Sequence, residues 1–229
     1  MILLINEIMP PKKHPIYVAV SMGVDSLAAC FYLRSKGYQV IPLHFNHKMR
    51  PQNDEMEDAF LEVLGEYGYC YSDHFEIGHG GGLETESECR EARLQFFKNA
   101  SVPKAEDFEK IIVTAHHLDD YQESYLLNCF RGHPEYKPMN LVSDFVSFKI
   151  IHPFLLTEKK DFVQFVDRWD NGKLKKYLTK DETNDTIKGS RRNWVRNVIV
   201  PEMDKAKVSL KKHCKDLIKK SICEISGDC

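Results

Sequence analysis

Residues 18–30 read VAVSMGVDSLAAC and place small polar side chains between an apolar run and a helical pattern. The apolar run 16–21 predicts a strand, and residues 25–36, closed by Gly37, have the spacing of a helix. A loop at this position attracts anions, because free backbone N–H groups point out of the helix N-terminus. Glycine 23 allows the backbone to approach phosphate oxygens, and the hydroxyl groups of Ser21 and Ser26 supply hydrogen-bond donors. Asp25 would orient a magnesium ion or an amine.

The same segment allows a simpler interpretation, in which Asp25 or Ser26 only caps the helix. Short motifs of this kind also recur by chance. No Gly-Lys-Ser or Gly-Lys-Thr follows the loop, which excludes a Walker-type phosphate site. From this stretch alone, both interpretations stay open.

A second group of polar residues, HHLDDYQE, follows the apolar run 110–115. Glu123 shares a helix face with Asp119 or Asp120, because it lies four and three residues after them. Paired carboxylates suit a cationic amine, whereas in the alternative the two aspartates stabilise a helix start and Glu123 faces solvent. Because His116 and His117 stand at the carboxyl end of a predicted strand, where α/β proteins bind ligands, we favour the functional interpretation.

Arginines occur in two further clusters. Arg90 and Arg93 lie three residues apart on one predicted helix face, and guanidinium groups suit phosphates. Residues 191–196, RRNWVR, would clamp an RNA backbone or an adenylate. Surface salt bridges and a basic helix end are the alternatives for these clusters.

The elements that position these residues alternate between strands and helices, which predicts an α/β protein with a parallel, doubly wound sheet. We expect strands in residues 16–21, 38–45, 71–77 and 110–115, and one or two more in residues 145–154. We expect helices in residues 25–36, 54–68, 84–99, 119–131 and 157–169. Thr157 would be the N-cap of the last of these helices. We expect a core in residues 1–170. A connector and a Lys-rich helical extension, interrupted at Pro201, would fill residues 171–229. Its last helix carries one apolar stripe, which favours a packed helix with a solvated face slightly over an RNA-binding one.

Composition narrows the class of protein. A formal net charge of −2 does not indicate a polyanion partner for the whole surface, so any nucleic-acid site must be local. No apolar run approaches the ~20 residues that cross a bilayer. The seven cysteines contain no CxxC pair, which favours reduced thiols in the cytoplasm over a zinc or iron–sulfur site. The glycine run 78–82 predicts a flexible loop.

Five segments in register resemble one family. SMGVDS is similar to the SGGxDS pyrophosphate loop of the N-type ATP pyrophosphatases, with Met22 in place of the first glycine. HFNHKMRPQNDEMEDAF, ECREARLQFF and TAHHLDDYQESYLLNCFRG resemble successive motifs of the tRNA(Ile)-lysidine synthetases. IHPFLLTEKKDFVQF also resembles that family, with His152 where arginine is usual, and so does DETNDTIKGSRRNWVRNVIVPEM.

The resemblance implies a Rossmann-like fold of the adenine nucleotide alpha hydrolase type, limited to the catalytic domain. It implies a ligase that uses ATP and Mg²⁺ to adenylate the wobble cytidine of a tRNA(Ile) with a CAU anticodon and then joins L-lysine at C2. By position, the catalytic residues would be Asp25, Arg93, Asp120, Glu123 and Arg196, and Asp25 would also bind the metal. ATP would be bound by residues Ser21, Met22, Gly23, Val24, Asp25, Ser26, Asn46, His47 and His116. Asp119, Arg90, Arg192 and Asn193 would contact substrate or tRNA.

Three other functions share parts of this pattern. A tRNA thiolase of the same superfamily commonly needs paired cysteines, and the sequence has no CxxC. An amide ligase acting on a small molecule would use the same adenylation step, and a nucleotide-binding module without turnover would bind ATP and release no pyrophosphate. A homodimer is among the assemblies that the sequence leaves open.

Overall fold

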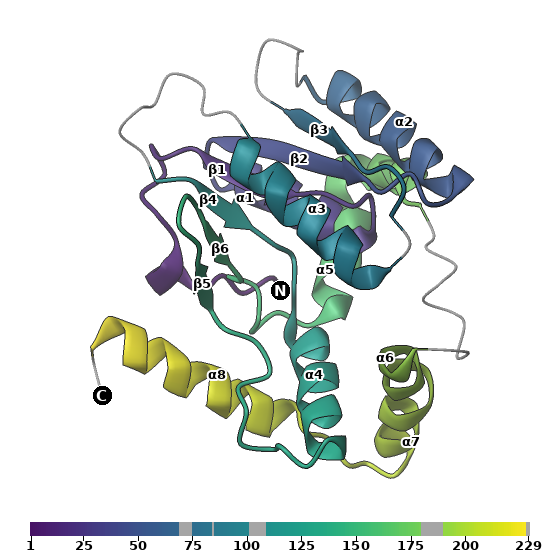
Figure 1. Cartoon of the computed structure of the whole chain (residues 1–229). Helices are drawn as coiled ribbons and strands as arrows, with labels where there is room; N and C mark the ends of the chain where they lie inside the picture. Colours follow the sequence, from purple (N-terminus) through teal and green to yellow (C-terminus); the bar gives the residue numbers. More distant parts are fainter. Residues whose placement is uncertain (69–74, 84, 101–108, 180–189, 228–229) are drawn as a thin grey trace.

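The computed structural model describes residues 1–68, 75–83, 85–100, 109–179 and 190–227, and within them it shows a six-stranded sheet (Figure 1). The spatial order is β3-β2-β1-β4-β6-β5. The strands are β1 (Ile16–Ala19), β2 (Val40–Asn46), β3 (Glu76–His79), β4 (Ile111–Val113), β5 (Val142–Asp144) and β6 (Lys149–Ile151). Neighbouring strands are parallel except for the antiparallel pair β5 and β6, so the predicted α/β sheet is confirmed.

Helices connect and cover these strands. The longer ones are α1 (Val24–Ser35), α2 (Pro51–Glu66), α3 (Glu86–Asn99), α4 (Leu118–Phe130) and α5 (Lys159–Arg168), with 3-10 turns η1 (Asn6–Ile8) and η2 (Trp169–Tyr177). The C-terminal part contains α6 (Arg191–Trp194), a π-helical turn η4 (Val195–Ile199), α7 (Val200–Lys205) and α8 (Lys211–Ser226). The predicted C-terminal helical extension is therefore present.

Both faces of the sheet are apolar, because successive side chains of a strand point to opposite sides. Ile16 and Val18 of β1 pack into a cluster with α1, α2 and α5, which also contains Leu174 and Tyr177 of η2. Tyr17, between them, packs on the other face with Ile112, Ile150 and side chains of α3. A parallel sheet covered on both faces in this way fits the near-continuous apolar character of β1 and β4.

The structure corrects several predicted elements. β5 lies before residues 145–154, where one or two strands were expected, and only β6 falls inside that range. Glycine 78 and His79 end β3, so the glycine run is not a loop throughout; a Cβ at position 78 would lie 2.5 Å from the Phe96 ring. The predicted strand at 71–77 and the predicted helix start at residue 84 lie partly outside the described residues.

Two helix boundaries also differ from the prediction. Glu158, not Thr157, is the N-cap of α5, because the Thr157 hydroxyl donates to the Leu3 carbonyl oxygen instead (2.7 Å). Pro201 does not interrupt the helix, because the chain runs without a break from η4 into α7; the turn just before Pro201 is π-helical instead of α-helical.

The strand order creates a crevice for a ligand. β1 lies between β2 and β4, and the chain leaves β1 and β4 towards different neighbours. In open α/β sheets, ligands bind outside the carboxyl ends of the strands at such a switch point. The loops after β1 and β4, which contain Ser21 and His116, therefore meet there, as the sequence predicts.

Candidate active site

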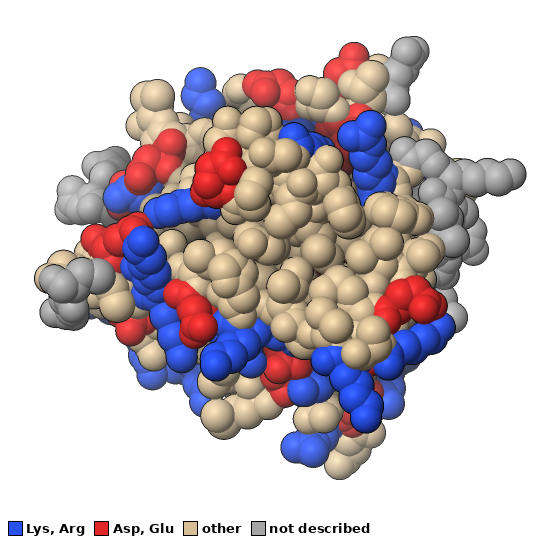
Figure 2. Space-filling model, turned by 90° about the horizontal axis from the view of Figure 1, so that it is seen from below, with Lys and Arg blue, Asp and Glu red and all other residues tan. Residues whose placement is uncertain are grey.

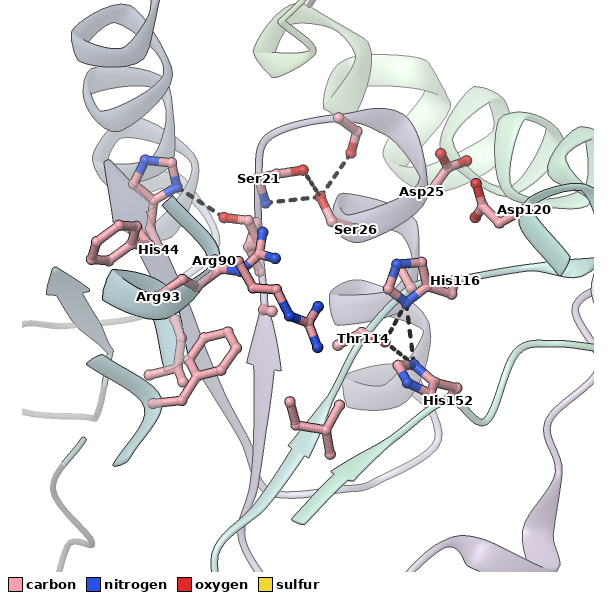
Figure 3. Close-up of a pocket in the computed structure, with 18 of the residues that line it drawn as sticks. Ser21, Asp25, Ser26, His44, Arg90, Arg93, Thr114, His116, Asp120 and His152 are labelled. Carbon is pink, nitrogen blue, oxygen red and sulfur yellow. Dashed lines mark hydrogen bonds between the residues drawn. The ribbon is translucent and has the colours of Figure 1, made fainter. Parts of the chain in front are cut away.

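A cleft of about 1100 Å³ lies at this switch point. It is lined by residues from the loops after β1, β2 and β4, from α3 and from β6, and its size exceeds the usual range for a drug-sized ligand. Figure 3 shows Ser21 and Ser26 at one end, Arg90 and Arg93 on one side, and Asp25, Asp120, His116 and His152 on the other. The space therefore has a basic side and an acidic side.

The loop between β1 and α1 is held by its own hydroxyl groups. The Ser26 hydroxyl donates to the Gly23 carbonyl oxygen (3.1 Å) and accepts from the Ser21 backbone N–H (3.0 Å). Gly23 is the N-cap of α1, and no side chain caps the helix. The interpretation that Asp25 or Ser26 merely caps α1 is therefore wrong. The first N–H groups of α1 are left to an anion, and Ser21, Gly23, Val24, Asp25 and Ser26 all line the cleft.

Met22, the bulky residue of this loop, has an unusual backbone conformation and a buried side chain. Its backbone is left-handed, with φ 63°, a conformation that costs a residue with a side chain roughly 1–2 kcal/mol. The side chain is fully buried in the main core rather than in the cleft, and burial of a Met contributes roughly 1.5–3 kcal/mol. The Met22 carbonyl oxygen accepts from the Thr179 N–H (3.2 Å). The room for a pyrophosphate in the cleft is therefore not reduced by this side chain.

His117 joins the loop to α4. Its Nε2 lies 3.5 Å from Asp25 Oδ2, and its Nδ1 accepts from the Asp120 N–H (3.3 Å) as the N-cap of α4. Burial alone lowers the pKa of His117, but the hydrogen bond with Asp25 and the charges of Asp120 and Asp25 outweigh it and raise the pKa. Burial raises the pKa of Asp120, and the neighbouring His117 and His116 reverse that effect and lower it. Two carboxylates that both line the cleft thus flank one imidazole.

Arg90 and Arg93 project from α3 into the cleft (Figure 3). Among the described residues, neither guanidinium forms a hydrogen bond or an ion pair with a carboxylate. Two guanidinium groups side by side on one wall of a cavity, without an acidic partner, favour an anion in front of them. The surface salt bridges considered for these arginines are thus not formed in the described part of the chain.

A group of neutral side chains lies beside these arginines. The His116 Nδ1 lies 2.9 Å from the Thr114 hydroxyl and 3.2 Å from the His152 Nδ1. Burial lowers the pKa of His152 to about 3, and the neighbouring His116 and Arg90 act in the same direction. Burial also lowers the pKa of His116, so both imidazoles are neutral at pH 7. They offer hydrogen bonds but no positive charge.

Glu123 is held by arginines from the C-terminal part. The Arg196 Nε donates to Glu123 Oε1 (2.7 Å) and its Nη2 to Glu123 Oε2 (2.8 Å), while Arg192 donates to the same carboxylate (3.3 Å). Glu123 is 4% exposed, and neither it nor Arg196 lines the cleft, whereas Arg192 does. The alternative in which Glu123 faces solvent is therefore wrong. The pair instead fixes α4 against α6 and η4, one layer behind the cleft.

Three other predicted site residues also lie behind or beside the cleft. The Asn46 side chain donates to Asp54 (2.9 Å) and Glu57 (2.6 Å) on α2. Asp119 accepts from the Lys159 N–H (2.8 Å) and pairs with Lys211, and Asn193 is buried. None of the three lines the cleft, whereas His47 and His116 do.

Sequence reasoning missed several residues that line the cleft. Thr114, His44, Lys159, Thr179 and Phe145 were not predicted, and His152 was noted only as a replacement. No sequence pattern indicates these residues, because each reaches the cleft only through the packing of strands and helices. Asp25 Oδ1, His44 Nε2 and His47 Nδ1 are buried in the cleft wall without a hydrogen-bond partner, as expected where a polar ligand binds.

The remaining chemistry of the described residues is limited. Cys30, Cys89, Cys129, Cys214 and Cys223 are free thiols. Within the ranges given above, no three His, Cys, Asp or Glu side chains are grouped to hold a metal ion. No helix in these ranges is both long enough and apolar enough to cross a membrane.

Comparisons with known proteins agree with this geometry. A family model described as the PP-loop domain matches residues 3–203. The tRNA(Ile)-lysidine synthase of Streptococcus sanguinis is 27% identical over 196 residues, which cover 83% of this chain and 42% of that protein. The enzyme of the same name from Staphylococcus aureus is 29% identical over 205 residues, which cover 82% of this chain and 44% of that protein. The chain thus spans less than half the length of these relatives.

A solved structure has the same fold. A U34-tRNA thiolase from Methanococcus maripaludis, described with its 4Fe-4S cluster, superposes with a TM-score of 0.65 at 16% identity, covering 93% of this chain and 73% of that one. At this identity the likeness concerns the fold alone. Since the family model matches most of the chain and the Ser21–Ser26 loop has the geometry of an anion site, this protein belongs to the PP-loop family.

Proposed function

We propose that this chain is an ATP-dependent tRNA(Ile)-lysidine synthase, a ligase that joins L-lysine to C2 of the wobble cytidine of a CAU anticodon. The proposal rests on one observation. An uncapped helix N-terminus and two unpaired arginines line the same cleft as a pair of carboxylates, which lie on its other side. This arrangement supports the binding of an anion and an amine in the same space. The names of the relatives supply the identity of the substrates.

The phosphates of ATP would bind at the N-terminus of α1. Ser21 and the residues from Gly23 to Ser26 line the cleft there, and Arg90 and Arg93 line it from α3. Beside the phosphates, the neutral His116 and His152 would accept or donate hydrogen bonds and would add no charge of their own. Pyrophosphate would leave within this cradle, which neutralises the charge that develops on it.

Asp25 is suited to hold Mg²⁺. Its Oδ1 is buried and has no hydrogen-bond partner, and magnesium is usually bound by one or two carboxylates together with substrate phosphates. The ion would supply charge neutralisation of the phosphates when bound. His117 keeps the Asp25 carboxylate oriented through its Nε2.

The reaction has two displacement steps. The O2 atom of cytidine attacks the α-phosphorus of ATP, and pyrophosphate leaves with the electrons of the broken P–O bond. The lysine ε-amine then attacks C2, AMP departs with the former O2, and the amine loses a proton. Asp120 and Asp25 would bind this amine, because both carboxylates line the cleft at His117.

Glu123 and Arg196 would act indirectly, through Asp120. The Arg196–Glu123 pair lies against Asp120, since Arg196 Nη2 is 3.4 Å from Asp120 Oδ1. It would hold Asp120 in place, while Arg192, at the cleft wall, would contact the adenylate or the RNA. Asp119, Asn46 and Asn193 would position the surrounding loops rather than touch the substrates.

The proposal is tested by pyrophosphate release from ATP and Mg²⁺, with and without lysine and a tRNA(Ile) transcript bearing CAU, followed by mass analysis of the nucleosides. We expect release that needs tRNA, and the mass of lysine added to cytidine. Asp120→Asn should raise the KM for lysine roughly 10-fold or more, because a charged hydrogen bond contributes ~1.5–3 kcal/mol. Asp58→Asn, on the exposed side of α2, is the matched control.

Two outcomes would contradict the proposal. Pyrophosphate release that does not depend on tRNA would favour an amide ligase that acts on a small molecule. Binding of ATP without any release would favour a nucleotide-binding module.

A further inference from the structure

Two aromatic side chains are exposed next to the cleft and are not used by the proposed reaction. Phe130 ends α4 and is 56% exposed, and Trp194 ends α6 and is 39% exposed. Their rings contact each other, with centroids 5.6 Å apart and planes tilted by 49°. Large apolar side chains that pair on the surface mark interaction sites more often than isolated ones do.

The position of this pair is fixed by the polar contacts between the same helices. The Arg192 Nη2 donates to the Ser124 hydroxyl (2.9 Å), and Arg196 binds Glu123 through two hydrogen bonds. Ser124 and Arg192 both line the cleft. Phe130 lies six residues beyond Ser124 on α4, about 9 Å along the helix, so the aromatic pair is carried by the same two helices as these cleft residues.

The charges around the pair are positive. Arg131 follows Phe130 at the end of α4, and Arg191 precedes Trp194 by one helical turn on α6. Both arginines are exposed, and neither forms an ion pair with any residue that the structure describes. In Figure 2, which views the molecule from the side of α4, α6, α7 and α8, side chains of both charges, with Lys and Arg prominent among them, border a broad uncharged area.

Exposed aromatic rings combined with unpaired arginines are the chemistry by which proteins bind single-stranded nucleic acid. Unstacked bases lie on the rings, and the guanidinium groups contact the phosphates. A second copy of this chain would bring the same arginines together and create repulsion between like charges. A single-stranded RNA loop is therefore the occupant that the charges favour.

We propose that Phe130 and Trp194, with Arg131 and Arg191, form a stacking site for an unpaired base of the RNA whose cytidine enters the cleft. The inference rests on the proposed function, because it takes the substrate to be RNA. It adds the surface that holds the loop while one nucleotide occupies the cleft.

The experiment measures binding of a labelled anticodon stem–loop RNA with CAU by fluorescence anisotropy at 0.15 M salt. Trp194→Ala and Phe130→Ala should each raise the Kd roughly 10-fold, within the range known for loss of base stacking. Trp194→Phe should restore most of the binding, since a ring remains. Arg131→Ala should lower the slope of log K against log salt by about one. Val163→Ala, an exposed apolar residue on α5, is the matched control.

Further readouts separate stacking from damage to the fold. Binding of ATP and the melting temperature should be unchanged in Trp194→Ala and Phe130→Ala. Tryptophan emission should change when RNA binds to the wild type and not when it binds to Trp194→Phe.

Several results would overturn the proposal. One is unchanged RNA affinity in both alanine variants. A second is a parallel loss of RNA affinity and melting temperature that Trp194→Phe does not rescue. A third is a change in sedimentation that identifies the pair as a contact between copies. Failure of the proposed function is distinguishable, because RNA would then bind through Trp194 without gaining lysine.

Discussion

The Ser21–Ser26 loop contains two neighbouring residues with opposite requirements. Met22 adopts a left-handed backbone that favours glycine, yet its side chain fills the core. Gly23 has φ −76°, which any residue adopts, and a Cβ there would meet only the Ser21 hydroxyl at 3.6 Å, an ordinary contact. The fold therefore does not require Gly23. Close approach of a phosphate to the backbone does.

Gly23→Ala separates these two requirements. We expect the stability of the variant to differ from that of the wild type by less than about 1 kcal/mol, because alanine restricts the unfolded chain but is a poorer N-cap than glycine. Its affinity for ATP should fall roughly 10-fold or more, because the methyl group lies where phosphate oxygens approach. Thermal melting with and without ATP measures both effects. Gly65→Ala, on α2 with open space around its Cβ, is the control for stability. Unchanged ATP affinity in Gly23→Ala would place the phosphates elsewhere.

Sequence reasoning located the cleft residues that follow strands but not those that reach the cleft by packing. Ser21, Asp25 and His116 could be placed, because parallel strands end at the same edge of a sheet. Glu123 could be placed on the right helix, but its partner Arg196 is 73 residues away in sequence. No local pattern indicates that such a pair forms or that it faces away from the cleft.

At the scale of elements, the start of α4 is held by its neighbours through charges. Asp119 pairs with Lys211 of α8 and accepts from the backbone of Lys159 at the start of α5. Glu158, the N-cap of α5, binds Lys211 (3.1 Å) and Lys215 (3.3 Å) of α8. Since Asp120 is the next residue of α4, these contacts also position the acidic side of the cleft.

Glu158→Gln tests this junction through its pH dependence. Hydrogen bonds from Lys160 and Lys211 lower the pKa of Glu158 from 4.5 to about 2. A lowered carboxyl pKa stabilises the fold above the ordinary pKa, and this stabilisation is lost as pH falls from about 4.5 through about 2. The variant should lose about 1 kcal/mol at pH 7, because the lysines are partly exposed and screened.

Urea unfolding at pH 7, 4 and 3 provides the measurement for Glu158→Gln. The deficit should shrink below pH 4.5, because the Glu158 carboxyl of the unfolded wild type then becomes protonated, while the folded one stays ionised down to about pH 2. Glu55→Gln, exposed on α2, should show no deficit at any of these values. A deficit that does not depend on pH would mean that packing rather than charge joins α5 to α8.

Element boundaries were predicted well for α1 and α4, which directly follow apolar strands, and poorly where a side chain has more than one available partner. α1 and α4 begin and end within one residue of their predicted bounds. Thr157 was expected to cap α5, but its hydroxyl binds the N-terminal segment, which the local sequence cannot indicate. β5 was missed because Val142–Asp144 is a short edge strand with little apolar character.

At the scale of the whole molecule, α8 and α6 lie on opposite sides of α4 (Figure 1). Cys214 and Ile218 of α8 are buried against Leu118 and Tyr121 of α4, which confirms the packed apolar stripe. The lysines of α8 include exposed Lys212 and Lys219, seven residues apart and on one face. A net charge of −2 gives the protein no general attraction for RNA, so recognition depends on which local cations touch it.

A double variant, Lys212→Glu with Lys219→Glu, decides between the two interpretations of α8. If these lysines only solvate the helix, RNA affinity at 0.15 M salt should change less than about twofold, because charges are screened beyond about 8 Å. The salt dependence of binding should stay that of the wild type, whereas Arg131→Ala and Arg191→Ala should each reduce its slope by about one. Anisotropy titrations at 0.05–0.2 M salt, about the range over which phosphate contacts are resolved, make the comparison. A large loss of affinity with a lower slope in the α8 variant would extend the RNA surface across α4 to α8, and the stacking site would then be one part of a wider interface.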